Sequence, residues 1–167
     1  MPTVFKNKDR EFQDDPKMVS PFLIQTAIPR LSMSAGARNL LFDMRLLKPG
    51  QYSFPYHSHR NAEEMMMVVS GSMTARTPEG LEVLETGDII FFEFGDSGAH
   101  QFFNHTSKPC TYLDVRTFLG LDVSDYPDTG KVNIIPQFEL YDSKTRIRYF
   151  DGEEKVSEKW EGLRKKK

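Results

Sequence analysis

The sequence predicts an all-β fold, a sandwich or barrel of short strands. Between about residues 35 and 120, short apolar, aromatic or β-branched runs alternate with turn signals at regular spacing. The chain has 167 residues, 38% of them hydrophobic, which is enough for one sizeable core and about one domain. No helix of ordinary length is needed within the alternating stretch.

The first 34 residues are mixed and carry Pro2, Pro16, Pro21 and Pro29. Proline lacks the backbone donor that helices and central strands need, so these positions favour an arm or edge strands over a long helix. We therefore divide the chain into an N-terminal arm (1–34), a β-barrel (35–120) and a C-terminal extension (121–167).

Seven strands are predicted in the barrel region, separated by turn signals such as Lys48-Pro-Gly and Thr77-Pro-Glu-Gly. They cover residues 39–47, 64–69, 72–77, 81–84, 89–94, 100–105 and 111–118.

Potential metal donors gather between Gly50 and Gly71. Side chains alternate faces along an extended strand, so His57 and His59 project the same way and can bind one ion together. Glu64 follows after the length of a tight turn, which lets a carboxylate from the returning strand reach the same ion. Imidazoles with one carboxylate suit a divalent transition metal such as Zn, Fe, Mn, Ni or Co, without choosing among them.

This segment resembles the first motif of the cupin family, which is Gly, about five residues, His-x-His, three or four residues, Glu, six residues, Gly. His57, His59 and Glu64 match it, and Gly71 follows Glu64 at the required distance. Gly50 stands one residue further from His57 than the motif asks. Glu63 also fits the permitted gap after His59. Only Glu64 keeps the six-residue step to Gly71, so Glu64 is the preferred ligand.

A second stretch resembles the second cupin motif, which is Gly, five residues, Pro-x-Gly, two residues, His, three residues, Asn. The matching residues are Gly87, Gly95, His100 and Asn104. Glu93 replaces the proline, and four residues rather than two separate Gly95 from His100, as though a small loop had been inserted near Gly98. This loop changes the rim of the predicted site but does not remove the metal ligand His100.

Taken alone, His100 is better explained as a strand histidine that is satisfied within the core. The apolar runs before and after it, joined by a Gly-Asp-Ser-Gly turn, form the hairpin that the second motif needs. His105 lies an odd number of residues away and faces the opposite side, so we predict a surface or packing role for it. The resemblance thus implies a metal site made of His57, His59, Glu64 and His100.

The resemblance also implies a double-stranded β-helix, the cupin jelly-roll barrel, with the metal in its wider interior. By strand phase, Met66 and Phe102 face this interior. Three further positions stay open: Tyr56 or Phe54, Met44 or Arg45, and Asp114 or Arg116.

The character of the chain changes after Gly120. We expect residues 134–141 to pack on the outside of the barrel and residues 145–150 to form one more strand. The charged segment 153–167 is typical of a solvated tail, in which Trp160 anchors the tail to the barrel or to a second subunit. The extension resembles that of a set of small single-domain cupins of uncharacterised function, and the resemblance implies a homodimer.

Coordination narrows the chemistry. Three imidazoles and one carboxylate leave an octahedral divalent ion two open positions for water, dioxygen or a chelating oxyanion. A hydrolytic zinc site typically has three protein ligands and a water, so four protein ligands argue against a zinc hydrolase. The leading interpretation is a metal-dependent enzyme, with Fe, Mn, Ni or Zn, that oxygenates, decarboxylates or isomerises a small molecule. The alternative is a non-catalytic protein that binds or senses a small ligand beside a metal.

Other classes of function find little support. A net charge of −2 gives no electrostatic reason to expect nucleic acid. No apolar run approaches the ~20 residues of a membrane span, and the N-terminus is too polar for a signal peptide. The single cysteine, Cys110, excludes an internal disulfide and is expected to be buried. We therefore expect a cytoplasmic protein that contacts neither nucleic acid nor membrane.

Overall fold

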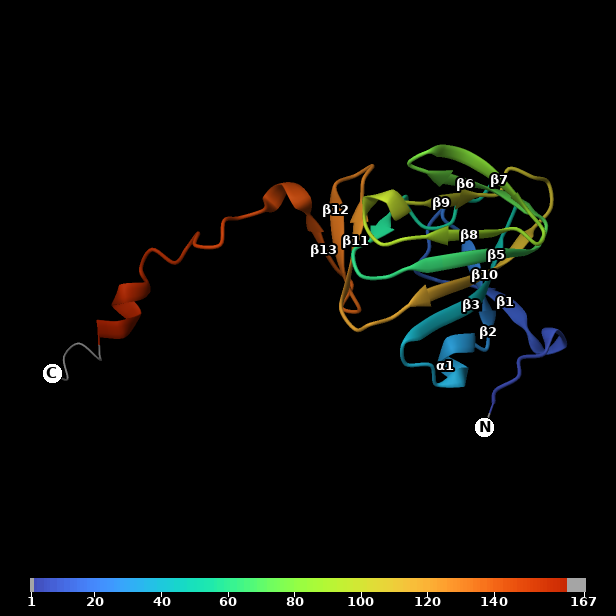
Figure 1. The fold of residues 1–167 in the computed structure, drawn as a ribbon, viewed down its shortest axis with the longest axis horizontal. Coiled ribbons are helices and arrows are strands. Elements are labelled where there is room, and N and C mark those ends of the chain that lie inside the picture. Colours follow the sequence, from blue (N-terminus) through green and yellow to red (C-terminus); the bar gives the residue numbers. More distant parts are fainter. Residues whose placement is uncertain (1, 162–167) are drawn as a thin grey trace.

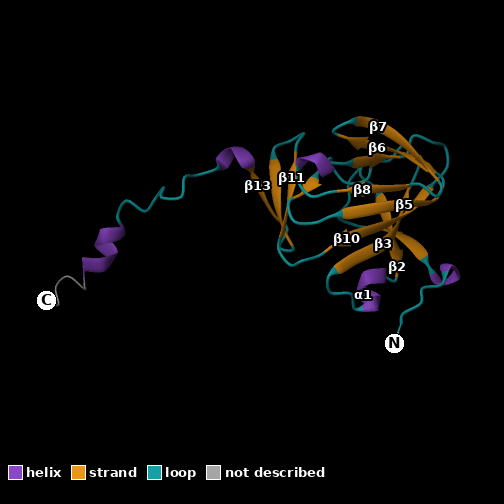
Figure 2. Ribbon diagram, viewed as in Figure 1, coloured by secondary structure: helices purple, strands orange, loops and turns teal. Residues whose placement is uncertain are grey.

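The computed structural model describes residues 2–161 and confirms an all-β, double-stranded β-helix fold (Figures 1 and 2). The strands are β1 Glu11–Asp14, β2 Ile24–Ile28, β3 Leu40–Leu47, β4 Ser58–His59, β5 Glu64–Ser70, β6 Ser72–Thr77, β7 Gly80–Glu85, β8 Ile89–Phe92, β9 Gln101–Phe103, β10 Cys110–Thr117, β11 Asp122–Tyr126, β12 Lys131–Ile135 and β13 Glu139–Asp142. The helical segments are α1 Leu31–Ala35 and the 3₁₀ turns η1 Asn7–Asp9, η2 Asp96–Gly98, η3 Ser143–Thr145 and η4 Val156–Trp160. None of the helical segments in residues 2–161 has the length and apolar character to cross a membrane.

Two sheets enclose the core of the barrel. One has six strands in the order β1-β2-β3-β10-β5-β8, and the other has three in the order β7-β6-β9. Buried side chains from both sheets form one cluster, including Met66 of β5, Met73 of β6 and Phe102 of β9. A third sheet, β13-β12-β11-β4, lies at one end of the barrel (Figure 1). This end sheet joins the C-terminal extension to the segment that carries His59.

All seven predicted strands are present, each within two residues of its predicted ends. Strand β5 shows why the sequence predicted them well, because Glu64, Met66 and Val68 are buried while the residues between them are more exposed. This period of two is what a sheet with one buried face requires.

Gly71 joins β5 to β6 at a point where the backbone leaves no room for a side chain. Its φ is +86°, and a Cβ at this position would lie 2.7 Å from the carbonyl oxygen of Pro109. Glycine alone adopts this conformation at little cost, so the last residue of the first motif is fixed by a tight turn against β10.

The N-terminal residues supply edge strands, as their prolines predicted. Strand β1 pairs antiparallel with β2, and β2 pairs with β3, so these strands extend one edge of the six-stranded sheet. The helix α1 then leads back to β3, against which it packs.

The predicted strand at residues 145–150 is wrong. The last strand is β13, Glu139–Asp142, and the residues after η3 have no β partner among residues 2–161. The apolar residues whose alternation suggested a strand are exposed to solvent in the single chain, with Ile147 79% and Tyr149 90% exposed. A strand needs a neighbour to bond, and the end sheet stops at β13.

The segment after η3 runs away from the barrel (Figure 1). Trp160 is 57% exposed and ends η4, a segment that lies away from the barrel in Figure 1, so the predicted anchoring to the barrel is not present. Its anchoring to a second subunit stays a prediction. The Arg-Lys-Lys-Lys end of the predicted charged tail lies outside the described residues.

Candidate metal centre

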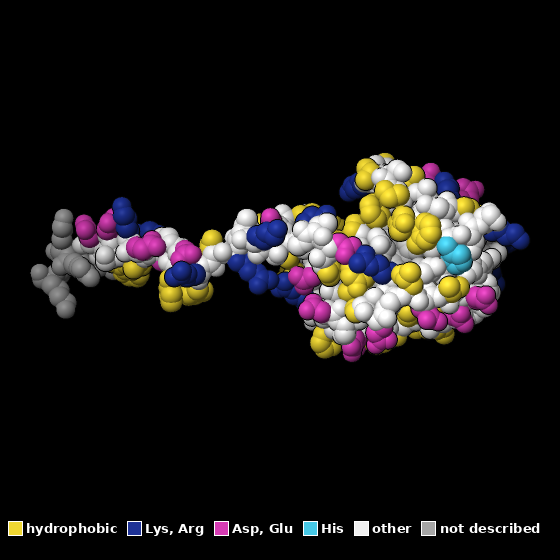
Figure 3. All heavy atoms as spheres, turned by 90° about the horizontal axis from the view of Figure 1, so that it is seen from above, with side chains coloured by type: hydrophobic (Ala, Val, Ile, Leu, Met, Phe, Trp, Pro, Cys, Tyr) yellow, Lys and Arg dark blue, Asp and Glu magenta, His cyan; other side chains and the backbone are white. Residues whose placement is uncertain are grey.

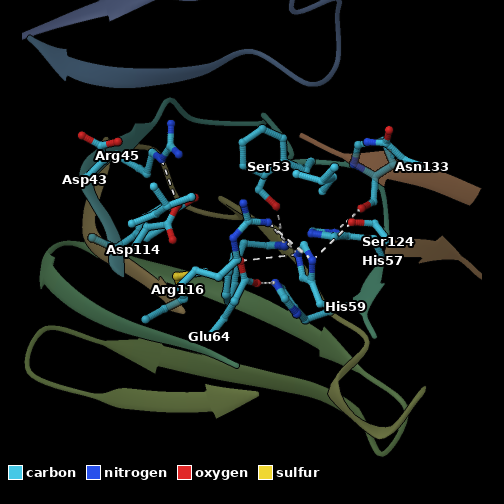
Figure 4. A pocket seen from close by; sticks show the side chains of 18 of the residues that line it. Asp43, Arg45, Ser53, His57, His59, Glu64, Asp114, Arg116, Ser124 and Asn133 are labelled. Carbon is cyan, nitrogen blue, oxygen red and sulfur yellow. Dashed lines mark hydrogen bonds and ion pairs between the residues drawn. The ribbon is translucent and has the colours of Figure 1, made fainter. Parts of the chain in front are cut away.

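The four predicted ligands line one cavity of about 320 Å³ inside the barrel (Figure 4). His57 and His59 come from the segment around β4, Glu64 begins β5, and His100 precedes β9. One donor atom from each of His57, His59 and Glu64 lies within 4.8 Å of the others. His100 is not part of this trio, but its Nε2 lies 2.9 Å from Oε2 of Glu64.

The backbone fixes the relation of His57 to His100. Each donates its N–H to the other's carbonyl oxygen, at 3.2 Å from His57 and 2.8 Å from His100. This antiparallel bridge sets the ring centroids 4.8 Å apart. The two motifs, far apart in the sequence, therefore meet through main-chain hydrogen bonds.

Each imidazole is oriented by an acceptor at Nδ1. The Nδ1 of His57 donates to the carbonyl of Pro55 at 2.8 Å, and that of His100 donates to the carbonyl of Gly98 at 2.9 Å. The loop that interrupts the second motif thus orients the ligand that follows it. With Nδ1 protonated, Nε2 of each ring keeps its lone pair, which is the usual arrangement of metal-binding histidines.

His59 is oriented by Asp122, a residue that the sequence analysis did not single out. Oδ2 of Asp122 accepts from Nδ1 of His59 at 2.5 Å, and Oδ1 accepts from the backbone N–H of Asn61 at 2.9 Å. Asp122 begins β11, which pairs with β4. One weak signal could have found it: Asp122 and Ser124 place polar groups on one face of a strand, and both are buried.

Glu64 presents a carboxylate without a satisfied set of hydrogen bonds. It is 7% exposed, and its Oε2 has no hydrogen-bond partner of acceptable geometry. Burial raises the pKa of Glu64, but the three neighbouring histidines outweigh burial and hold the pKa well below its usual range. Glu63 is exposed on the other side of the strand, which agrees with the choice of Glu64.

The donor set fits a divalent transition metal. Burial, followed by the proximity of His100, lowers the pKa of His57 to about 3, so its imidazole is neutral. Nitrogen lone pairs and an ionised carboxylate oxygen that accepts no well-formed hydrogen bond therefore face the same space. A buried anion of this kind is costly unless a cation or hydrogen bonds compensate it.

Among the open lining positions, Arg45 rather than Met44 faces the cavity. Met44 packs on the other side of β3, against Ala27 and Leu31. Asp114 and Arg116 were considered alternatives, but they are two apart on β10 and both line the cavity.

Phe54 lines the cavity, as do Met66 and Phe102, in agreement with the predicted phase. Tyr56 does not, and its ring lies under the guanidinium of Arg76, 4.0 Å from the ring centroid. His105 is exposed and bonded to Thr74, which confirms that it faces away from the site.

Two of the three arginines that line the cavity form close ion pairs, and the third does not. Arg45 contacts Asp114 at 3.0 Å and Arg30 contacts Asp43 at 2.6 Å. Burial raises the pKa of Asp114, although Arg45 opposes the shift. Arg116 has a looser contact, with its Nε 3.7 Å from Oε1 of Glu64.

The C-terminal extension closes the remaining side of the cavity. Its contribution comes from the end sheet, through Ser124, Tyr126, Asn133, Ile135 and Phe138. Oδ1 of Asn133 is buried without a hydrogen-bond partner. Tyr126 lies parallel to His57, with ring centroids 6.0 Å apart. Sequence reasoning missed this wall because no local pattern indicates that β11 pairs with the two-residue strand β4.

Comparisons with known proteins agree with this geometry. Residues 44–116 match the family model of the cupin domain. No curated protein matches the chain by sequence.

Several solved structures share the fold. A sugar phosphate isomerase from Silicibacter pomeroyi is 22% identical, with a TM-score of 0.75, and the match covers 89% of this chain and 98% of that one. A protein from Acidithiobacillus ferrooxidans, provisionally assigned as a sugar phosphate isomerase, is 21% identical with a TM-score of 0.77, over 87% of this chain and 95% of that one. A predicted oxalate decarboxylase from Thermotoga maritima is 19% identical with a TM-score of 0.55, over 70% of this chain and all of that one. The two motifs, the barrel and the match over residues 44–116 agree that this part of the chain is a cupin domain.

Proposed function

We propose that His57, His59, Glu64 and His100 bind one divalent transition metal and that the protein is a metal-dependent enzyme acting on a small molecule. The observation that carries this proposal is the convergence of three oriented imidazoles and an unsatisfied carboxylate in an enclosed cavity of about 320 Å³. A bound ion would supply Lewis-acid polarisation of a substrate oxygen or, if it is redox-active, oxygen chemistry. Iron, manganese, nickel and zinc all suit this donor set.

Ionisable groups beside the ligands favour an enzyme over a protein that only binds or senses a ligand. Proton transfer needs a titratable group within hydrogen-bond reach of the substrate. The cavity offers the carboxyl group of Asp114 and the hydroxyl of Tyr126, and burial raises the pKa of both. The hydroxyl of Tyr126 can donate a proton to a substrate oxygen, and the carboxylate of Asp114, ion-paired with Arg45, can accept one.

Isomerisation is the first reaction to test among oxygenation, decarboxylation and isomerisation. The structures that cover most of this chain include the Silicibacter pomeroyi sugar phosphate isomerase. An isomerisation that moves a proton between carbon and oxygen needs groups that take up and release protons, and Asp114 and Tyr126 could supply them. The non-catalytic alternative predicts ligand binding without turnover of any substrate.

The experiment is elemental analysis by plasma mass spectrometry on tag-free protein purified without added metal. We expect near one equivalent of a transition metal in the wild type and none in His100→Ala. His105→Ala is the matched control, because His105 is exposed and bonded to Thr74, and should keep its metal. No metal in the wild type after reconstitution, or loss in His105→Ala with retention in His100→Ala, would overturn the proposed site.

We further propose that the protein is a cytoplasmic homodimer whose subunits meet through β7 and β8. These strands lie at the free edges of two sheets and carry Leu81, Val83, Ile89 and Phe91, each more than half exposed. Hydrophobic side chains gather on the face of the barrel seen in Figure 3. Edge strands with apolar side chains favour self-association, and a two-fold axis would cover the same strands in both copies.

Sedimentation equilibrium tests the dimer. The wild type should have about twice the chain mass of 19.3 kDa. Phe91→Ser should shift it toward monomer, and Tyr149→Ser, at an exposed position outside both strands, should not. A wild type that is monomeric at all concentrations would exclude this interface.

A further inference from the structure

One charged group in the cavity lacks a dedicated partner. The lining residues include three arginines and three carboxylates, but Arg30 and Arg45 each have their own aspartate. Arg116 is left with Glu64, at 3.7 Å and without a hydrogen bond between them. If Glu64 binds a metal, as proposed above, Arg116 has no anion committed to it among the cavity-lining residues.

The side chain of Arg116 is nevertheless held inside the site. It is 18% exposed, and its Nη1 lies 3.4 Å from Nδ1 and 3.3 Å from Nε2 of His59. Near-equal distances to both ring nitrogens place the guanidinium against the face of the ring rather than in line with one lone pair. Its Nε and Nη2 form no hydrogen bond within the described residues, so their N–H groups are available to a planar oxyanion beside His59.

Across the cavity from the Arg45–Asp114 pair lies a second unpartnered group, Oδ1 of Asn133 (Figure 4). Asn133 is 5% exposed and lines the cavity. Burial raises the pKa of the neighbouring Tyr126, and the side chain of Asn133 opposes that shift. Oδ1 of Asn133 is therefore a buried acceptor without a donor, which costs folding free energy unless a ligand supplies the hydrogen bond.

We propose that the cavity binds a small oxyanion that carries a neighbouring hydroxyl group, with the anion on Arg116 and the hydroxyl donating to Oδ1 of Asn133. This substrate class rests on the proposed function, because it assumes that Glu64 is a metal ligand. With an ion bound, the three arginines and the divalent charge exceed the three carboxylates by two, which favours an anionic ligand. A cavity of about 320 Å³ lies at the small end of ligand sites, which suits a molecule of a few carbon atoms.

The test is isothermal titration calorimetry with glycolate, acetate and inorganic phosphate, on metal-loaded and chelator-treated protein. Glycolate and acetate share a carboxylate and differ by the hydroxyl. The wild type should bind glycolate more tightly than acetate. Phosphate binding tighter than glycolate, and lost in Arg116→Gln, would support the anion site and show that it prefers a phosphate group to a carboxylate.

Two variants separate the two contacts. Arg116→Gln should weaken glycolate and acetate at least tenfold, because it removes a charge-assisted hydrogen bond, and Arg116→Lys should restore part of the affinity. Asn133→Leu should lower glycolate affinity to that of acetate and leave acetate unchanged. Arg76→Gln, which alters an exposed arginine paired with Asp128, is the control and should change neither. Melting curves by circular dichroism verify that each variant is folded.

Unchanged anion affinity in Arg116→Gln would overturn the anion site, and equal affinity of the wild type for glycolate and acetate would overturn the hydroxyl contact. Metal content separates these failures from failure of the proposed function. Protein that binds no metal but binds glycolate through Arg116 would contradict the metal site and keep the anion site. Protein that binds metal but no oxyanion would do the reverse.

Discussion

At the scale of single residues, the site depends on how each ligand is held as much as on which ligands are present. The spacing of the two motifs predicted His57, His59, Glu64 and His100, and the cavity contains all four. Asp122 was not predicted, although it contacts Nδ1 of His59. Its role depends on a pairing between segments more than 60 residues apart, and local sequence periodicity cannot predict such a pairing.

Asp122→Asn tests this support. We expect metal affinity to fall about 10- to 100-fold, because the amide no longer stabilises the oriented, electron-rich imidazole of His59. Competition with a chromophoric chelator measures the change. Asp125→Asn is the control, since Asp125 contacts the exposed Arg60 instead. Equal effects of the two substitutions would argue against a specific role for Asp122.

The two neighbouring glutamates provide a second test at this scale. Glu64→Gln should remove most bound metal, because it replaces the buried ionised donor, whereas Glu63→Gln should keep near-wild-type metal content because Glu63 is exposed. Plasma mass spectrometry on both purified variants gives the comparison. The reverse result would show that the shorter gap in the first motif is the one used.

At the scale of elements, the strands of the barrel were predictable and the elements outside it were not. Strands β5 and β6 show burial with a period of two, which the sequence displays directly. Strand β4 has two residues, and its partner β11 follows much later, so no pattern within either segment identifies the end sheet. The erroneous strand at 145–150 shows the converse, because alternation alone cannot supply a partner for the backbone.

The turn between β5 and β6 yields an element-scale prediction. Gly71→Ala should destabilise the protein by more than the ~1–3 kcal/mol typical of a non-glycine residue in a strained backbone conformation, because the new Cβ would also meet Pro109 at 2.7 Å. Gly120→Ala is the matched control, as its φ is +97° with open space around the new Cβ. Urea denaturation of both variants measures the difference, and equal losses would mean that the β5–β6 turn relaxes easily.

At the scale of the whole molecule, one core joins the two barrel sheets, and Cys110 lies within it. Cys110 is fully buried, as the sequence predicted, and burial raises the pKa of its thiol to about 11. A thiol that stays protonated and inaccessible reacts through opening of the fold. The remaining whole-molecule features, above all the partner of the edge strands, depend on surfaces that sequence periodicity does not address.

We therefore expect Cys110 to resist a disulfide reagent at pH 8 in native protein and to react at once in denaturant. Because the folded-state pKa lies above the unfolded value of 9.0, the thiol favours folding below pH 9, and this contribution is lost as pH rises toward 11. Labelling kinetics followed by absorbance, in native and in denatured protein and as a function of pH, measure the reactivity of the thiol. Rapid labelling of native protein would indicate local opening of β10.

The contact between Asp122 and His59 also couples metal binding to the folding of the C-terminal extension. A ligand that binds a site stabilises every segment needed to complete that site, by an amount set by its concentration relative to Kd. Residues 44–116 carry all four ligands, yet the group that orients His59 comes from β11, beyond the end of that match. Metal binding and closure of the end sheet are then linked equilibria. The amide hydrogens of β11 and β12 would exchange more slowly in the metal-loaded protein, and so report its metal content from outside residues 44–116.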